Sequence, residues 1–251
     1  MGNLKGKTAV ITGGNSGIGY AAASKFKDLG ATVIITGRNQ AAVKQAASEL
    51  GVTGLVADQG DVGDIEGLVS QVEEEFGHVD VLFINAGVAA FAPVGQLTEE
   101  QFDSTMDINF KGAFFTLQKF LPILREGASV INLGSINAYT GMPNTAVYAA
   151  SKAALNSLTR TAASELAPHK IRVNSVNPGP TSTAIFGKLG MPEAAVQEFA
   201  AAMQQRIPLE RFGNPEEIAT LVAFLASDEA AFITGAEYNI DGGTNVNPVL
   251  A

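Results

Sequence analysis

The sequence contains no cysteine, which excludes both a disulfide framework and a thiolate nucleophile. It also has no cluster of lysine and arginine, and its formal net charge of -9 disfavours nucleic acid or an anionic membrane surface as a partner. No apolar run approaches the ~20 residues of a membrane span, and glycine-rich sequence begins before any stretch long enough for a signal peptide. We therefore expect a cytoplasmic protein, and a chain without cysteine suits that reducing compartment.

Histidine is scarce as well. The two histidines, His78 and His169, lie far apart in the sequence, and neither belongs to a pattern of metal ligands. Catalytic zinc sites in proteins use grouped histidine, cysteine and carboxylate ligands. We therefore expect no catalytic metal.

What the sequence does have is a large hydrophobic fraction, 46%, beside only 16% charged residues. This composition predicts a well-buried core, and no linker, repeat or low-complexity tract divides the chain. Short β-branched runs alternate with longer segments of helical period, a pattern typical of parallel sheets. We predict one α/β domain with a Rossmann-like, doubly wound parallel sheet and helices on both faces. The expected strands are 8–12, 32–36, 54–57, 79–87, 129–135, 171–179 and 236–240, and the expected helices are 17–29, 40–50, 64–76, 99–124, 147–167, 192–204 and 215–226.

The loop after the first expected strand is rich in glycine, and ligands of such sheets bind at the carboxyl ends of the strands. Its sequence, TGGNSGIG, places Gly13, Gly17 and Gly19 between a strand and a helix. Glycines there let the backbone approach a pyrophosphate, which the N–H groups at the start of the helix can bind. A plain turn is the alternative, but the flanking strand and helix favour a dinucleotide site.

The end of the second expected strand bears on the choice of cofactor. A fold that prefers NAD normally carries an acid there for the ribose 2′-hydroxyl, whereas this strand continues into Gly37, Arg38 and Asn39. The guanidinium of Arg38 can pair with a 2′-phosphate. We therefore predict NADP(H) as the favoured cofactor, with NAD(H) as the alternative if Arg38 is only a solvated surface residue.

Two further strand ends carry candidate cofactor contacts. The third expected strand ends at Asp58 and Gln59, and the Asp58 carboxylate can accept a hydrogen bond from an adenine amino group or instead cap the next helix. The fourth ends at Asn85, Ala86 and Gly87. Asn85 can bond backbone groups of neighbouring strands, and Gly87 leaves room for a ribose. An ordinary turn is the alternative for this second group.

Tyr148 and Lys152 lie four residues apart in the segment AVYAASKAALNSL, so a helix would place them on one face. A phenol of ordinary pKa near 10 is a poor base at neutral pH unless a cation stabilises its phenolate, and a lysine ammonium can do so. The pair can also arise by chance. Ser135 favours the catalytic interpretation, because it ends the strand SVINLGS and so emerges at the same sheet edge as the glycine loop.

Taken together, TGGNSGIG, INAG, the Asn109 of DINFKG, Ser135, the Tyr148 and Lys152 pair and NPGPTST resemble the motifs of the short-chain dehydrogenase/reductase family in its single-domain form. The resemblance continues through RFGNPEEIA and ITGAEYNIDGG and so spans nearly the whole chain. It implies an NAD(P)(H)-dependent oxidoreductase that interconverts a ketone and a secondary alcohol. It also implies a homotetramer paired through the long helices and the C-terminal region.

The resemblance implies a role for each catalytic residue. Tyr148 is the general acid for ketone reduction and the base for alcohol oxidation, and Ser135 hydrogen-bonds the substrate oxygen. Lys152 lowers the tyrosine pKa and binds the nicotinamide ribose. Asn109 helps to hold a proton-relay water.

The resemblance also assigns cofactor contacts. The three loop glycines match the pyrophosphate site, Asp58 the adenine contact, and Asn85 the ribose side. Thr183 matches the residue that meets the nicotinamide carboxamide or the diphosphate. Two positions depart from the family pattern: Ile84 stands where many members have asparagine, and Thr181 replaces a frequent isoleucine. The full predicted cofactor set is Gly13, Asn15, Ser16, Gly17, Ile18, Gly19, Arg38, Asn39, Asp58, Gln59, Asn85, Ala86, Gly87, Tyr148, Lys152, Pro178, Gly179, Thr181 and Thr183.

The segments expected around the substrate are apolar, which predicts an uncharged, fairly hydrophobic ketone or secondary alcohol. A substrate lid is expected over about 181–205. An alternative role for the apolar side chains is to pack this lid onto the domain. The expected lining residues are Phe91, Ile136, Tyr139, Met142, Phe186 and Leu189.

Two rival functions stay open at this stage. Reduction of 3-oxoacyl groups on an acyl-carrier protein predicts a basic patch at the mouth of the site, for which the sequence offers little beyond Lys188, Arg206 and Arg211. A nucleotide-sensing protein that has lost catalysis predicts a missing tyrosine, lysine or serine. None of the three is missing.

Overall fold

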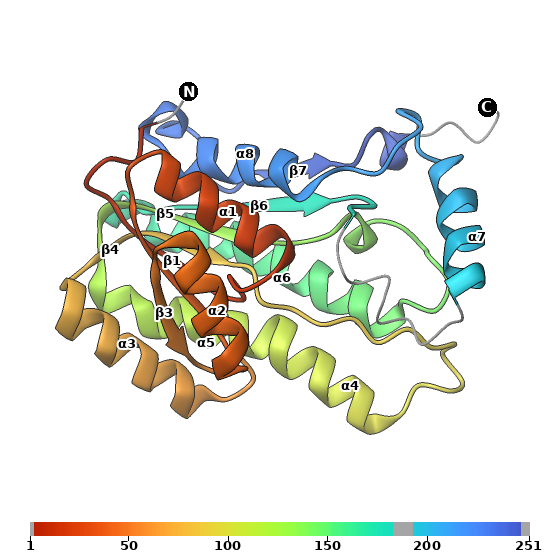
Figure 1. The fold of residues 1–251 in the computed structure, drawn as a ribbon, viewed down its shortest axis with the longest axis horizontal. Coiled ribbons are helices and arrows are strands. Elements are labelled where there is room, and N and C mark those ends of the chain that lie inside the picture. Colours follow the sequence, from red (N-terminus) through yellow and green to blue (C-terminus); the bar gives the residue numbers. More distant parts are fainter. Residues whose placement is uncertain (1–2, 183–192, 247–251) are drawn as a thin grey trace.

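The sheet of this protein is fully parallel. The computed structural model describes residues 3–182 and 193–246, and in that part of the chain seven strands pair in the order β3-β2-β1-β4-β5-β6-β7 (Figure 1). This order confirms the predicted doubly wound α/β fold. The strands are β1 (Thr8–Ile11), β2 (Thr32–Gly37), β3 (Thr53–Val56), β4 (Val79–Ile84), β5 (Leu124–Leu133), β6 (Arg172–Pro178) and β7 (Glu237–Ile240).

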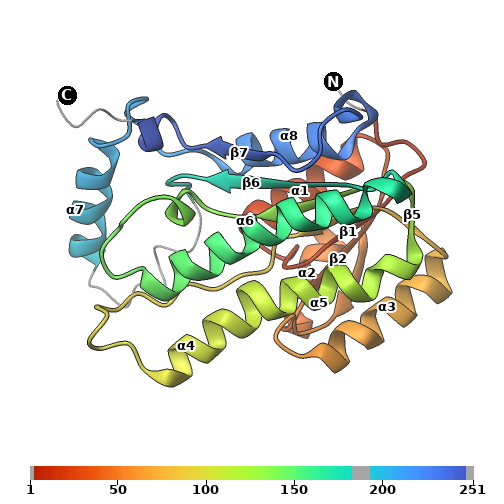
Figure 2. The same cartoon turned by 180° about the vertical axis from the view of Figure 1, so that it is seen from behind.

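Helices cover both faces of the sheet (Figures 1 and 2). Helices α1, α2 and α8 share one hydrophobic cluster with the strands, and α3, α5 and α6 share the other. The central strands are therefore buried on both sides, which explains their continuous rather than alternating apolar sequence. The helices are α1 (Gly17–Asp28), α2 (Gln40–Leu50), α3 (Val62–Phe76), α4 (Glu99–Met106), α5 (Gly112–Phe120), α6 (Ala146–Leu166), α7 (Glu193–Gln204) and α8 (Pro215–Ala226).

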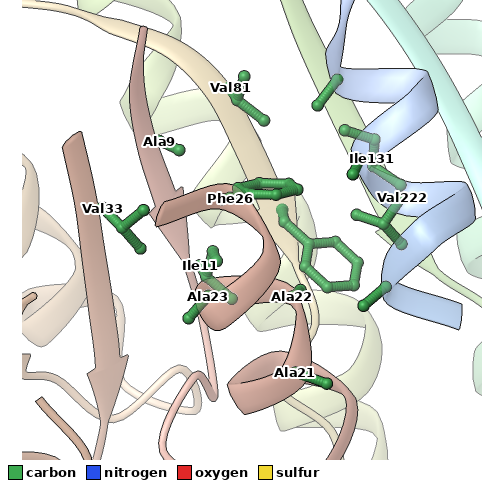
Figure 3. Packing of buried hydrophobic residues seen from close by; sticks show 14 of the residues in the cluster. Ala9, Ile11, Ala21, Ala22, Ala23, Phe26, Val33, Val81, Ile131 and Val222 are labelled. Carbon is green, nitrogen blue, oxygen red and sulfur yellow. The ribbon is translucent and has the colours of Figure 1, made fainter. Parts of the chain in front are cut away.

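The core under α1 is built around Phe26. Its ring is fully buried among Val81 and Ile131 of the central strands and Val222 of α8 (Figure 3). Burying a side chain of this size stabilises the fold by roughly 1.5–3 kcal/mol. Ala22 and Ala23 beside it are small enough for α1 to lie close to the sheet. This packing fixes α1, whose first turn follows the glycine-rich loop.

The segment expected as one helix over 99–124 is divided in the structure. A π-helical turn, Asp107–Lys111, separates α4 from α5. Gly112 follows this turn. A Cβ atom at this position would lie 2.0 Å from the Gln59 carbonyl oxygen, so there is no room for a side chain. Hydrophobic periodicity does not distinguish a single π turn from the α-helix around it. Such turns are frequent at functional sites.

Strand β5 begins earlier than the expected 129. Leu124 already pairs with Val79, and the register shifts before Ser129 pairs with Val81. Gly127 lies between them with a φ of +84°, a conformation that glycine adopts without strain. The exposed residues of this bulge carry no strand pattern, so the sequence alone did not reveal it.

The predicted lid over 181–205 is described only at 181–182 and from 193 onward, where α7 begins, so its function stays a prediction. Helices α4 and α7 and the start of α6 lie at the same end of the molecule (Figures 1 and 2). Within the described residues, no helix has the length and apolar character needed to cross a bilayer.

Candidate active site

Tyr148 lies in the first turn of α6, and Lys152 follows one turn later. The Lys152 ammonium is 5.9 Å from the centre of the Tyr148 ring and donates a 2.7 Å hydrogen bond to the Leu133 carbonyl at the end of β5. The Lys152 side chain is buried, with the residue only 4% exposed. The helix therefore brings together the two residues that the sequence pattern placed on one face.

Burial shifts the pKa of both groups. It raises the pKa of the Tyr148 phenol, and the hydrogen bond with Ser135 opposes this rise. It lowers the pKa of Lys152 to about 8. Burial outweighs the other influences on the phenol, and the Lys152 ammonium is bonded to the Leu133 carbonyl, so the expected lowering of the tyrosine pKa by Lys152 stays a prediction. At neutral pH Tyr148 is therefore a protonated phenol, the form that a general acid requires.

Ser135 lies just beyond the end of β5 and begins a 3-10 turn, Ile136–Ala138. Its hydroxyl accepts a 3.1 Å hydrogen bond from the Asn137 N–H and is also hydrogen-bonded with Tyr148. Strand and turn thus hold a second hydroxyl beside the phenol, at the carboxyl edge of the sheet.

Asn109 lies in the π-helical turn and is buried. Its amide nitrogen donates to the Val88 carbonyl at 2.8 Å and to the Ser151 hydroxyl at 3.1 Å, and its oxygen accepts from the Val88 N–H at 2.8 Å. Ser151 in turn donates to the Tyr148 carbonyl at 2.7 Å. Asn109 therefore fastens the loop after β4 to the tyrosine helix, and its part in holding a water stays a prediction.

The glycine loop follows β1 and turns through left-handed backbone conformations. Gly13 has a φ of +64° and Gly17 a φ of +54°, values that favour glycine. A Cβ at Gly19 would lie 2.4 Å from the Gly13 carbonyl oxygen, so the loop closes tightly on α1. Helix α1 has no acid in its first turn, and the exposed Ser16 at its start makes no side-chain cap. The loop and helix start therefore fit a pyrophosphate.

The loops after β1 and β4 are tied together by Thr12. Its hydroxyl accepts from the N–H groups of Asn85 and Ala86, both at 3.0 Å. The Asn85 amide donates to the carbonyls of Thr12 at 2.8 Å and Gly13 at 3.1 Å. A Cβ at Gly87 would meet the Asn109 oxygen at 3.2 Å and the Lys152 nitrogen at 3.5 Å, so the loops predicted to bind the cofactor and the predicted catalytic residues converge here.

Comparison with known proteins places the chain in a family. A family model described as Enoyl-(Acyl carrier protein) reductase matches residues 13–245. The oxidoreductase asL5 of Sarocladium schorii is 42% identical over 245 residues, which cover 96% of each chain. The chain belongs to the short-chain dehydrogenase/reductase family. Its oxidoreductase class and NAD(P) cofactor follow from this membership.

Further relatives in this family have more specific names. The 3-oxoacyl-(acyl-carrier-protein) reductase FabG of Thermotoga maritima is 41% identical, covering 96% of this chain and 98% of the relative. The NADP-dependent (R)-specific alcohol dehydrogenase of Lentilactobacillus kefiri is 36% identical, covering 96% and 97%. The crystal structure of levodione reductase matches with a TM-score of 0.90 at 32% identity, over 97% of this chain and 99% of that one.

Two residues predicted to lie at the adenine end of the cofactor, Arg38 and Asp58, have groups that are free to bind. Arg38 is exposed, and no hydrogen bond or ion pair occupies its guanidinium within the described residues. Asp58 accepts from the Gly60 N–H through Oδ1 at 2.9 Å, which leaves Oδ2 available. Asn15 lies close to Gly37 at the end of β2. Its side-chain oxygen would be 2.5 Å from a Cβ atom placed on Gly37.

Two other predicted cofactor residues also have structural roles. The Asn39 side chain caps α2 by accepting from the Ala42 N–H at 2.9 Å. Gln59 is buried, and its amide donates to the carbonyls of Ala86 at 3.1 Å and Ile108 at 3.0 Å. Gln59 thus joins the loop after β4 to the π-helical turn, and both hydrogens of its side-chain amide are used in doing so.

The turn after β6 brings the predicted Pro178, Gly179 and Thr181 to the same sheet edge. A Cβ at Gly179 would lie 2.6 Å from the Cβ of Asp241, so this position accepts only glycine. The Thr181 hydroxyl donates to the Gly179 carbonyl at 3.0 Å and so stabilises its own turn. Thr183 lies outside the described residues.

The predicted substrate-lining residues separate into three groups. Phe91 lies with its ring centre 6.4 Å from that of Tyr148 and is 40% exposed, whereas Ile136 is buried and Met142 is half-buried. The Tyr139 hydroxyl donates to the Glu237 carboxylate, and the residue is 49% exposed, so its place beside the substrate stays a prediction. Phe186 and Leu189 lie outside the described residues.

Thr12, Ser151 and Glu237 are among the residues that contribute to this site and that the sequence did not single out. Each acts through hydrogen bonds between segments that are distant in the chain. A threonine ending a strand or a serine in an alanine-rich helix carries no local signal of such a role.

Gly19→Ala is expected to weaken cofactor binding at least about tenfold, because the new methyl would displace the Gly13 carbonyl or the Asn85 amide. Overpacking of this kind also costs roughly 1–3 kcal/mol of stability. The Kd of NADPH, from fluorescence titration, measures the first effect. The control is Gly67→Ala in the exposed part of α3, where a Cβ meets nothing within 4 Å and binding should be unchanged. Unaltered NADPH affinity in Gly19→Ala would contradict the assignment of the glycine loop to the cofactor.

Proposed function

We propose that this chain is an NAD(P)(H)-dependent carbonyl reductase and alcohol dehydrogenase, with NADP(H) favoured and Tyr148 as the general acid and base. The observation that carries the proposal is the convergence of the Tyr148 phenol, the Ser135 hydroxyl and the Lys152 ammonium at the carboxyl edge of the sheet. The glycine loop at the same edge of the sheet suits a dinucleotide. An NADP-dependent (R)-specific alcohol dehydrogenase among the relatives agrees with this function.

The protein's part in the reaction is to bind, orient and move one proton. When bound, the nicotinamide supplies or accepts the hydride. Ser135 hydrogen-bonds the carbonyl oxygen of the substrate, and Tyr148 gives its phenolic proton to that oxygen as negative charge develops there. The phenolate that remains lies beside the Lys152 ammonium, which stabilises it. In alcohol oxidation the same phenolate takes the hydroxyl proton back.

The described surroundings of Tyr148 favour an uncharged substrate. Phe91 packs near the phenol ring, and Ile136 contributes buried apolar surface beside Ser135. Arg211, one of the few cations considered for an anionic substrate, is engaged by the Glu217 carboxylate in two hydrogen bonds of 2.8 Å and 2.7 Å. These features favour a hydrophobic ketone or secondary alcohol.

The second candidate function is 3-oxoacyl reduction on an acyl-carrier protein, which the FabG relative and the name of the matching family model favour. A screen of ketones, β-ketoesters and 3-oxoacyl thioesters, with NADPH and NADH oxidation as the readout, separates the two functions. Turnover of simple ketones supports the proposed function. Turnover confined to 3-oxoacyl thioesters favours the second, and no turnover of any carbonyl contradicts both.

Arg38→Gln is expected to lower the ratio of kcat/KM for NADPH over NADH by at least about tenfold, because a charge-assisted pair with the 2′-phosphate is lost. NADH turnover should change little. Arg125→Gln, which removes an exposed guanidinium near Asp80 at the opposite strand ends, is the matched control. A wild-type preference for NADH, or an unchanged ratio in Arg38→Gln, would contradict the NADP(H) assignment.

The assembly is proposed to be a homotetramer. Large apolar side chains are exposed on the helices expected to pair, including Phe102 of α4, Phe114 of α5 and Phe224 of α8. Covering such surface is a common cause of association. Size-exclusion chromatography with light scattering is expected to give four times the chain mass of 26.0 kDa, and a monomer would contradict the proposal. A cytoplasmic location stays a prediction of the sequence.

A further inference from the structure

A polar cluster lies behind the Ser135 turn, and the proposed mechanism makes no use of it. At its centre, the Tyr139 hydroxyl donates to the Glu237 carboxylate. The same hydroxyl accepts from the side-chain amides of Asn156 at 2.9 Å and Asn177 at 3.2 Å. The four residues come from the segment after the 3-10 turn, from α6, from β6 and from β7. One hydroxyl therefore connects four elements.

The cluster is fastened to the helix that carries Tyr148 and Lys152. Asn156 lies one turn beyond Lys152 on α6, and Arg160, one turn further, forms an ion pair with Glu237. Asn156 also accepts from the Ser175 hydroxyl at 2.8 Å, so the contact continues into β6. Burial and the Glu237 carboxylate both raise the pKa of Tyr139, so its hydroxyl keeps the proton that it donates.

Tyr139 is connected to Ser135 by a short, hydrogen-bonded turn. The Ala138 N–H donates to the Ser135 carbonyl at 3.0 Å, and the Tyr139 N–H donates to the Ile136 carbonyl at 2.9 Å. On the other side of Ser135, a Cβ at Gly134 would lie 1.9 Å from the side-chain oxygen of Asn177. Ser135 is thus held by the same cluster from both sides and has little freedom to shift.

We propose that Tyr139 is a positioning residue for the reaction: its hydroxyl, held by Glu237 and by two buried asparagines, fixes the Ser135 turn against α6 and so places the Ser135 hydroxyl beside Tyr148. This inference rests on the proposed function, in which Ser135 orients the carbonyl oxygen. A shift of about 1 Å in such a group can cost up to about a hundredfold in rate. Tyr139 acts through Ser135 and does not touch the substrate through its hydroxyl.

The kinetic test is a double-mutant cycle with Ser135→Ala. Tyr139→Phe is expected to lower kcat for ketone reduction about tenfold in the wild-type chain and less than about twofold in the Ser135→Ala chain, because the group it positions is then absent. The KM for NADPH should stay within about twofold in both. Equal losses of kcat in the two backgrounds, or no loss in the wild-type chain, would overturn the proposal.

Three companion variants separate positioning from general destabilisation. Tyr20→Phe removes a hydroxyl that also bonds a glutamate, Glu49 at 3.2 Å, but outside the site, and should leave kcat unchanged. Glu237→Ala should lower kcat as much as Tyr139→Phe does. If the Tyr139→Phe chain does not fold, Glu237→Ala takes its place in the test. Glu237→Gln, which keeps an acceptor oxygen for Tyr139, should retain about half of kcat or more. A loss in Glu237→Gln as large as that in Glu237→Ala contradicts the proposed role of the acceptor.

A second measurement does not depend on turnover. The chain has four tyrosines, so isotope labelling at tyrosine Cζ gives few NMR signals, and Tyr148→Phe assigns the one of interest. Because Ser135 hydrogen-bonds with Tyr148, Tyr139→Phe and Glu237→Ala are expected to shift the Tyr148 signal, whereas Tyr20→Phe is not. If the protein reduces no carbonyl compound, the proposed function fails. The Tyr148 signal then still shows whether Tyr139 positions Ser135 beside Tyr148. An unmoved Tyr148 signal in both variants would overturn it.

Discussion

Tyr148→Phe is expected to lower kcat for ketone reduction by about a thousandfold, within the range typical of a positioned general acid. Phenylalanine keeps the ring that packs near Phe91 but has no proton to give to the developing alkoxide. Cofactor binding should remain measurable, because the glycine loop and the ends of β2 and β3 are proposed to hold the cofactor without Tyr148. Single-turnover kinetics with a reactive ketone, together with the Kd of NADPH, measure the two effects separately.

Tyr238→Phe is the control for this prediction, because it removes a phenol from β7 whose ring only packs against the core. Its kcat should equal that of the unaltered chain. If Tyr148→Phe retained more than about a tenth of the normal kcat, Tyr148 would not be the proton donor, and the assignment of the site would have to change.

Lys152→Met is expected to make the protein more stable but nearly inactive. At neutral pH the fold holds a buried ammonium whose pKa is lowered to about 8, which means that burial opposes its charge. Removing that charge should raise the free energy of unfolding at pH 7 by roughly 2 kcal/mol, after allowance for the lost hydrogen bond to the Leu133 carbonyl. The same change should lower kcat by about a hundredfold or more, since the phenolate loses its counter-charge.

The pH dependence of stability provides the check on this prediction. The folded pKa of Lys152, about 8, lies below the ordinary value of 10.5, so the unfolded chain binds more protons between these values. Relative to Lys152→Met, the unaltered protein should therefore gain stability as pH rises from about 8 toward 10.5. Denaturant unfolding at a series of pH values measures the difference. A variant that is less stable at pH 7, or a difference that does not change with pH, would contradict the account.

Much of the fold could be predicted from the sequence, because helices cover both faces of the parallel sheet. Continuous β-branched runs such as TAVI and TVIITG have few alternatives to a buried strand. The predicted ends of most elements lie within a few residues of the observed ones. The placement of Tyr148 and Lys152 on one face was equally accessible, since a spacing of four on a helix fixes a shared face.

The features of the fold and the site that the sequence did not predict depend on contacts between distant segments, which no local pattern encodes. At the π-helical turn, Asn109 bonds Val88 and Ser151, and the following Gly112 passes close to Gln59. Tyr139 was expected at the substrate because it follows the Ser135 turn. Its hydroxyl meets a glutamate from the last strand, 98 residues away. The end of the Gln59 side chain likewise turns inward to carbonyls of two other loops.

The central claim is that the three groups at the carboxyl edge direct hydride to a carbonyl carbon and a proton to its oxygen. Its most direct test uses NADPH carrying deuterium at the transferable position of the nicotinamide ring, with a substrate that contains both a ketone and a conjugated carbon–carbon double bond. NMR of the product locates the label. The account predicts deuterium on the carbon that now bears the hydroxyl. Deuterium on the former double bond, with the ketone intact, would contradict it.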